Sequence, residues 1–110
     1  MKKEEILQKL GAYKEKLVNL QVKINRIERM AQYKDSEVFD FYKNDLELLL
    51  TTIELSLTAC ELAVNRTYSL YSDGFISDPE RYAEEELKRS IKEVNKEIKQ
   101  VQGLITKAVN

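Results

Sequence analysis

Apolar residues recur every three or four positions along most of this chain, and this rhythm predicts α-helices. In the first third, and again after Pro79, the apolar steps alternate between four and three, which is the heptad seam of a helix that packs on one side. The first seam comprises Ile6, Leu10, Tyr13, Leu17, Leu20, Ile24, Ile27 and Ala31, and the last comprises Leu87, Ile91, Val94, Ile98, Val101, Ile105 and Ala108.

The middle of the chain carries a seam that does not continue the first one. Extending the first seam beyond Ala31 would place polar residues such as Asp45 in a core, so the phase breaks near residues 34–36. Asp35 or Ser36 can cap a new helix there. A single helix through this point is the alternative, because neither Gly nor Pro enforces a turn. The middle seam comprises Phe39, Tyr42, Leu46, Leu49, Ile53, Cys60 and Ala63, widened by Leu50, Leu57 and Val64.

Residues 72–80 mark a clearer boundary, because they combine turn residues with a helix start signal. Asp78 can cap a helix that begins at Pro79, where the missing N–H of proline costs nothing. Ser77 with Glu80 three residues later is an alternative capping box.

The pattern therefore predicts three helices, about 3–33, 36–71 and 79–108. At 1.5 Å per residue each is on the order of 45–55 Å long. Long helices with short connections favour an antiparallel, coiled-coil-like three-helix bundle. No segment alternates with the period of two that a strand needs. We expect an all-α protein in which residues 1–110 form a single helical domain.

The middle helix has a second apolar row, seven residues apart and roughly opposite its seam. Polar residues separate the two rows, with Glu47, Glu54 and Glu61 along one edge. Either this helix lies between the other two, or the second row stays open and binds a second copy or a partner helix. Burying it would contribute several kcal/mol at about 25 cal/mol per Å². The second row comprises Phe41, Leu48, Leu55 and Leu62.

Charge adds an asymmetry that the total conceals. A third of the residues are charged, and the net charge is −1. Residues 1–34 carry a net charge of +5, residues 35–78 carry −7 and residues 79–110 carry +1. A basic helix beside an acidic one biases which helices pair, although each exposed ion pair contributes under about 1 kcal/mol.

The residue types present exclude much chemistry. The chain has no His and one Cys, which rules out Ser-His-Asp and Cys-His catalysis and zinc sites built from this chain alone. Three Gly leave no glycine-rich phosphate loop. We expect no enzymatic activity, cofactor, metal or small-molecule substrate. Cys60 lies on the middle seam, where a thiol is a small buried hydrophobe.

No apolar run reaches the ~18 residues of a membrane span, and no Sec-type signal core follows Met1. These features predict a cytoplasmic location without membrane contact, and secretion without such a signal remains an alternative. Aromatic residues gather at the two helix junctions, where they either plug the bundle ends or form a contact patch. They comprise Tyr33, Phe39, Phe41 and Tyr42, and then Tyr68, Tyr71, Phe75 and Tyr82.

Two short motifs resemble those of small secreted helical-hairpin proteins of the WXG100 class and of the helical partners of LXG-type toxins. Residues 71–74 are similar to the turn, and Tyr82 with Glu86 resembles the Tyr-x-x-x-Asp/Glu export motif. The resemblance implies signal-independent secretion. The chain departs from the family in lacking Trp and in having a third long helix, and Tyr33 with Glu37 matches the same export pattern.

We interpret the chain as a non-enzymatic helical interaction module, such as an adaptor, small chaperone or inhibitor. The predicted partner-binding residues are Phe41, Leu48, Leu55 and Leu62, which would engage another protein or a second copy in a homo-oligomer. One alternative is a secreted or secretion-targeting protein. Another is weak nucleic-acid binding through the basic residues of 3–33, which the interspersed Glu and a pI of 5.6 disfavour.

Overall fold

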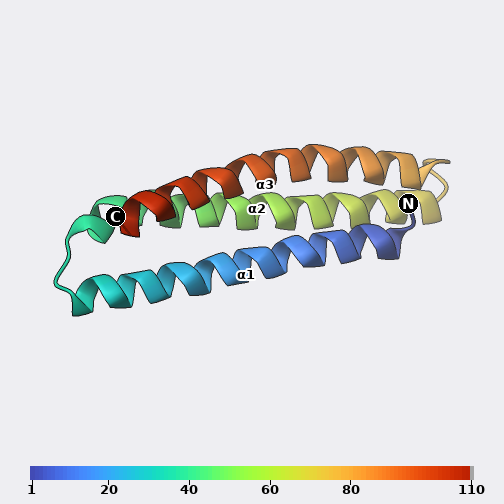
Figure 1. Ribbon diagram of the computed structural model, residues 1–110. Helices are drawn as coiled ribbons and strands as arrows, with labels where there is room; N and C mark the ends of the chain where they lie inside the picture. The colour runs from blue at the N-terminus through green and yellow to red at the C-terminus, as the bar shows by residue number, and fades with distance from the viewer. Residues whose placement is uncertain (110) are drawn as a thin grey trace.

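The computed structural model describes residues 1–109 as three long α-helices: α1 (Lys3–Tyr33), α2 (Val38–Ser72) and α3 (Pro79–Val109). The helices run up, down and up in an antiparallel bundle (Figure 1). No strand occurs in the described residues. The predicted all-α three-helix bundle is therefore confirmed. The bounds of α1 match the prediction, α3 extends one residue further, and α2 begins two residues later than predicted.

The three heptad seams meet in one continuous core. Ile53 of α2 and both Val94 and Val101 of α3 are fully buried, as expected for a repeat that keeps its apolar residues on one side. α1 is held less tightly, because most of its seam is only partly buried. Figure 1 shows α1 diverging from the other two helices toward Tyr33. The core of the bundle is therefore centred on α2 and α3.

The first junction is a break, as predicted, but its residues act differently from the prediction. α1 ends in a Schellman motif, in which the Ser36 N–H donates to the Ala31 carbonyl and the Asp35 N–H donates to the Gln32 carbonyl. Asp35 has a left-handed φ of 54° and closes α1. It does not cap α2, which begins at Val38 after Glu37, a residue without a side-chain cap bond. Ser36, the other predicted cap, accepts a hydrogen bond of 3.4 Å at its Oγ from the Val38 N–H.

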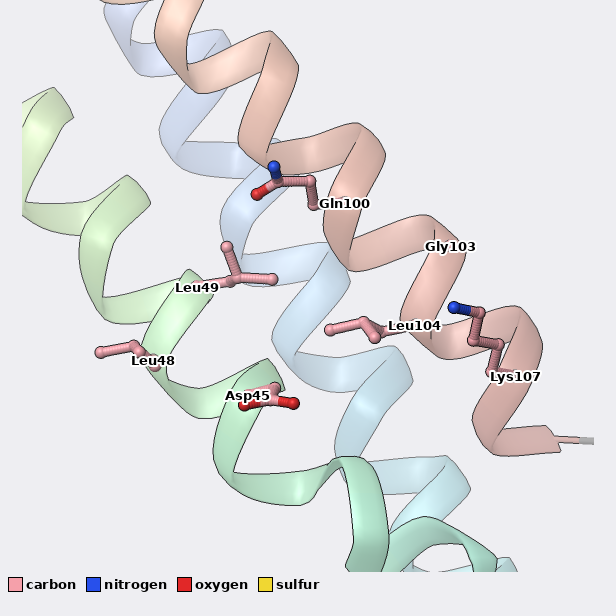
Figure 2. A pocket seen from close by; sticks show the side chains of 7 residues that line it. All are labelled: Asp45, Leu48, Leu49, Gln100, Gly103, Leu104 and Lys107. Atoms are coloured by element: carbon pink, nitrogen blue, oxygen red, sulfur yellow. The ribbon is translucent and has the colours of Figure 1, made fainter.

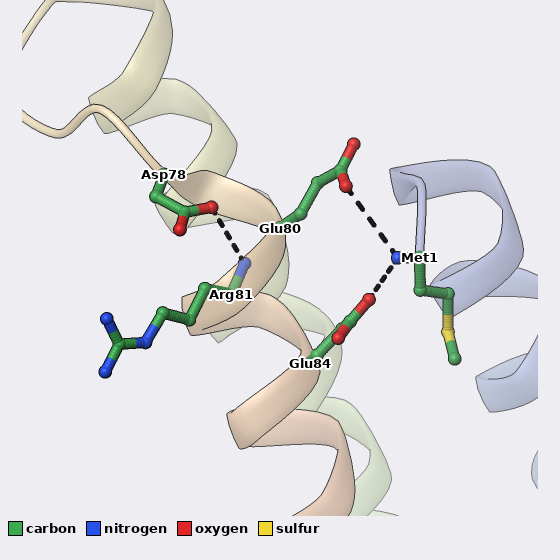
Figure 3. Close-up of polar contacts among 5 residues, drawn as sticks. All are labelled: Met1, Asp78, Glu80, Arg81 and Glu84. Carbon is green, nitrogen blue, oxygen red and sulfur yellow. Dashed lines mark hydrogen bonds and ion pairs between the residues drawn. The ribbon is translucent and has the colours of Figure 1, made fainter.

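The second junction repeats this ending and then starts a helix as predicted. Gly74, at φ 82°, closes α2, with the Phe75 N–H donating to the Leu70 carbonyl. Asp78 then caps α3, because its Oδ1 accepts a hydrogen bond of 3.3 Å from the Arg81 N–H (Figure 3). Pro79 occupies the first position of α3. The Asp78–Pro79 start signal is confirmed.

The N-terminal end of α1 is tied to α3. The Met1 ammonium forms an ion pair and hydrogen bond with Glu84, and Glu80 lies 3.7 Å away (Figure 3). The bond to Glu84 raises the pKa of the Met1 ammonium and lowers the pKa of the Glu84 carboxyl. Lys3 also lies over the Tyr68 ring, 5.6 Å from its centroid.

The bundle is a rod with extents of 60 × 17 × 17 Å and a Cα radius of gyration of 17.5 Å. Its length follows from helices of 31, 35 and 31 residues joined by short turns. Each helix therefore presents a solvent face that runs most of the length of the molecule.

Candidate interaction surface on α2

The second apolar row of α2 is open to solvent. Phe41 is 79% exposed, and Leu48, Leu55 and Leu62 are 67%, 64% and 65% exposed. Two residues before Leu55, Ile53 is 0% exposed, so the two sides of α2 differ sharply. We call the exposed row and the side chains around it the outer face of α2.

The arrangement of the three helices explains why this row stays open. α1 and α3 both pack against the seam of α2 and against each other, as a three-helix bundle requires. No helix then remains to cover the opposite side of α2 in the described chain. The expectation that α2 is enclosed on both sides within the chain is wrong, and the alternative of an open row agrees with the structure.

Apart from Asp45, Arg66 and the acidic row described below, most side chains around the row are small and uncharged. The hydroxyls of Thr51 and Thr52 donate to the carbonyls of Glu47 and Leu48 at 3.0 and 2.9 Å. Both hydroxyls therefore find their hydrogen-bond acceptors within the helix. Thr51 and Thr52 stand three and four residues from both Leu48 and Leu55, a helical spacing that places them beside the row. The surrounding residues comprise Asn44, Thr51, Thr52, Thr58 and Ala59, all exposed.

An acidic row borders the outer face on the side of α1. Each of its residues immediately precedes one residue of the apolar row, so it lies about 100° around the helix from it. Glu61 forms an ion pair with Lys14 of α1. The other three acids form no ion pair within residues 1–109. We call this row, which comprises Asp40, Glu47, Glu54 and Glu61, the acidic edge.

A groove of about 540 Å³ lies on the other side, between α2 and α3 (Figure 2). Leu48 and Leu49 line it from α2, and Leu104 points toward α2 from α3. Gly103 also lines it, and a Cβ built there would meet nothing within 4 Å. The groove therefore extends the apolar surface of the outer face toward the C-terminal half of α3.

The aromatic residues divide between the two predicted roles. The idea that they plug the bundle ends holds for Phe39, which is buried, and for Tyr42 and Tyr68, which are partly buried. It is wrong for the rest, which project into solvent. Phe41 stacks edge-on against Tyr42, with centroids 5.0 Å apart, and so continues the outer face toward the first junction. The exposed aromatics are Tyr33, Phe41, Tyr71, Phe75 and Tyr82.

The other candidate residues occupy ordinary structural positions. Residues 71–74 close α2, and Glu86 of α3 pairs with Arg89 of the same helix. On α1, Lys14 reaches Glu61 and Lys16 lies 4.6 Å from the centroid of the Tyr13 ring. None of these contacts brings the basic residues of α1 into one patch.

Reactive groups are sparse among the described residues. Burial raises the pKa of the Cys60 thiol, whose Sγ lies 4.0 Å from the Glu86 carbonyl oxygen. Burial also raises the pKa of Glu97, and one of its carboxylate oxygens is buried without a hydrogen-bond partner. No group of three or more potential metal ligands is present in residues 1–109. No helix in this part of the chain has the length and apolar character needed to cross a membrane.

Comparisons with protein-family models, with curated proteins and with solved structures find no match to this chain.

Proposed function

We propose that the protein is a non-enzymatic interaction module that docks through the outer face of α2. One observation supports this most strongly: four large apolar side chains at heptad spacing are each about two-thirds or more exposed. Scattered exposed hydrophobics are ordinary, but a row of them along one helix is typical of a protein-binding surface. The module would act as an adaptor, a small chaperone or an inhibitor, and it would bind another protein or a second copy of the chain.

The heptad spacing indicates the geometry of docking. Over the three repeats from Phe41 to Leu62, a straight helix turns the row by about 20° per repeat. A partner helix that crosses at about +20° follows this drift and keeps its own apolar residues in contact. A helix is therefore the shape that matches this surface best.

An affinity capture with a paired variant tests the proposal. The bait carries Leu48→Glu and Leu55→Glu, which place two charges on the outer face without touching the core. The matched control carries Asn95→Glu and Thr106→Glu, two exposed positions of α3. We expect quantitative mass spectrometry to find proteins, or untagged copies of the chain, that the wild type and the control retain and the bait variant loses.

The same proteins should be followed by sedimentation equilibrium and by circular dichroism. Unchanged helix content in all three would show that lost binding reflects the surface and not unfolding. Identical captured proteins for both double variants, together with identical sedimentation, would refute docking through this face.

Signal-independent secretion and nucleic-acid binding through α1 are the two alternative functions that the sequence predicts. The Tyr82 side chain is exposed on the first turns of α3, where an export receptor could reach it. Export that survives Tyr82→Ala in a folded protein would count against the first alternative. Absence of binding to nucleic acid at low salt would count against the second.

A further inference from the structure

The charges beside the outer face of α2 indicate what kind of helix it binds. Asp40, Glu47 and Glu54 of the acidic edge are exposed and form no ion pair within residues 1–109. Lys43 is the cation of α2 nearest to them in sequence, and it is held by Glu28 of α1 at 3.0 Å. Glu28 raises the pKa of Lys43 most, and Glu47 and Asp40 raise it further, so Lys43 partly balances these two carboxylates. The three exposed carboxylates still outnumber this one cation, and none of the three is held in an ion pair.

The α2 helix of a second copy does not supply that counter-charge. In an antiparallel contact between two α2 helices, like edges meet, which places Glu54 near its own equivalent and Glu47 near Glu61. A parallel contact pairs Glu61 with Arg66 but sets Asp40 against Asp45. Neither arrangement neutralises Glu47 and Glu54, and like charges brought together oppose association.

The surface beside the acidic edge has room for long cationic side chains. Two shallow hollows of about 340 Å³ each lie between α1 and α2. Glu54 lines both of them, and Leu17 and Gln21 of α1 line both as well. Lys14, which pairs with Glu61, lines one hollow, and no Lys or Arg lines the other, which Glu47 shares with Glu54. A Lys or Arg can lay its aliphatic stem along such a hollow while its charged end meets the carboxylate.

We propose that the outer face of α2 binds an amphipathic helix of another protein, whose apolar stripe is flanked by Lys or Arg. The basic flank faces Glu47 and Glu54, and the apolar stripe packs on Leu48, Leu55 and Leu62. This inference rests on the docking function proposed above and specifies its partner.

The size of the surface sets the expected strength. From Phe41 to Leu62 the face is about 32 Å long and as wide as a helix, which is 10–12 Å. Such a contact buries on the order of 500 Å² on each partner, close to the lower limit for a specific interface. We therefore expect dissociation constants in the micromolar range, with association that weakens as salt increases.

Two helical peptides of equal length provide the probes. Both carry Leu at heptad positions on an Ala-rich helix, and their flanking positions are Lys in one and Glu in the other. A third peptide keeps the Lys flanks and replaces each Leu by Ala. By fluorescence anisotropy at low salt, we expect the Lys-flanked Leu peptide to bind about tenfold more tightly than the Glu-flanked one. The Ala version should not bind measurably.

Variants of the full chain then locate the interaction. Leu55→Glu should abolish binding of the Lys-flanked peptide, and the control Thr106→Glu should leave it unchanged. The double variant Glu47→Lys, Glu54→Lys should reverse the preference, so that the Glu-flanked peptide binds more tightly. We expect the double variant to remain folded, because both positions are exposed.

Three results would overturn the inference. They are equal affinity for the two flanked peptides, a preference that survives the double charge reversal, and a chain that dimerises through α2 and excludes both peptides. Equal affinities that are both lost with Leu55→Glu would refute the basic partner while leaving the docking function standing. If neither peptide binds, the inference fails, and the capture experiment decides the docking function independently.

Discussion

The two faces of α2 should differ strongly when the same kind of side chain is removed from each. Ile53 and Leu55 are two residues apart, and both are branched four-carbon side chains. Ile53 is 0% exposed in the core, whereas Leu55 is 64% exposed on the outer face. The variants Ile53→Ala and Leu55→Ala therefore compare burial directly, with nearly the same change in composition.

The magnitudes follow from the carbons removed. Ile53→Ala deletes three buried methyl or methylene groups, worth about 0.8 kcal/mol each, or about 2.4 kcal/mol together. A residual cavity of roughly 50 Å³ adds about 1.2 kcal/mol, so the expected loss is about 3–4 kcal/mol. Leu55→Ala removes groups that are mostly in water and leaves no cavity, so the free energy of unfolding should fall by less than about 1 kcal/mol.

Urea unfolding, followed by circular dichroism at low micromolar protein, measures both losses. With an m value of about 1.5 kcal/mol per molar urea, the midpoint should fall by about 2 M for Ile53→Ala and by under about 0.7 M for Leu55→Ala. If Ile53→Ala is too unstable to measure, Ile53→Val should still cost about 1 kcal/mol. Losses that agree within about 0.5 kcal/mol would refute the assignment of the two faces.

Four further outcomes follow from the helix ends and the buried groups. Gly74→Ala should lower the free energy of unfolding by about 1 kcal/mol, because φ at Gly74 is 82° and a Cβ is disfavoured there. Asp35→Gly should raise it by about 0.5 kcal/mol, because Asp35 has a left-handed φ of 54° that glycine adopts without that cost. Changes of the opposite sign in urea unfolding would contradict both expectations. The Cys60 thiol should react with a disulfide reagent on the order of 100-fold more slowly in the folded protein than in guanidinium, and equal rates would show that it is accessible. Glu97→Gln should stabilise the protein by up to about 1 kcal/mol at pH 7. Burial raises the pKa of Glu97 above its ordinary value of 4.5, so the wild type loses stability as the pH rises past 4.5 and through the raised pKa. The variant should therefore be more stable than the wild type by a larger margin at pH 7 than at pH 4. An equal margin at the two pH values would contradict this role of Glu97.

The heptad rhythm predicted the helices and the core well, because a helix buries whatever side its apolar residues share. Leu46, Ile53 and Val94 are fully buried as that rhythm requires. The start of α2 was predicted two residues too early for a specific reason. Asp35 belongs to a residue type that suits both a helix N-cap and a left-handed helix end, and the sequence does not distinguish these roles. The hydrogen bonds of the Schellman motif decide between them.

The openness of the outer face could not be settled from the sequence. An apolar row opposite the seam fits a helix enclosed on both sides as well as a helix with a free face. Leu55 is exposed because α1 and α3 both lie on the side of Ile53, and that arrangement depends on packing among all three helices. The threonines beside the row are predictable from the sequence, since Thr51 and Thr58 stand at helical spacing from Leu55.

The shape of the bundle affects how its assembly has to be measured. A compact chain of 110 residues has a radius of gyration of about 13 Å, whereas this rod has 17.5 Å. A particle about 3.5 times as long as it is wide experiences more drag than a sphere of its 12.9 kDa mass. A lone molecule will therefore leave a gel-filtration column earlier than a sphere of its mass, at an apparent mass between those of one chain and two. Methods that measure molar mass independently of shape, such as light scattering or sedimentation equilibrium, will distinguish one chain from two.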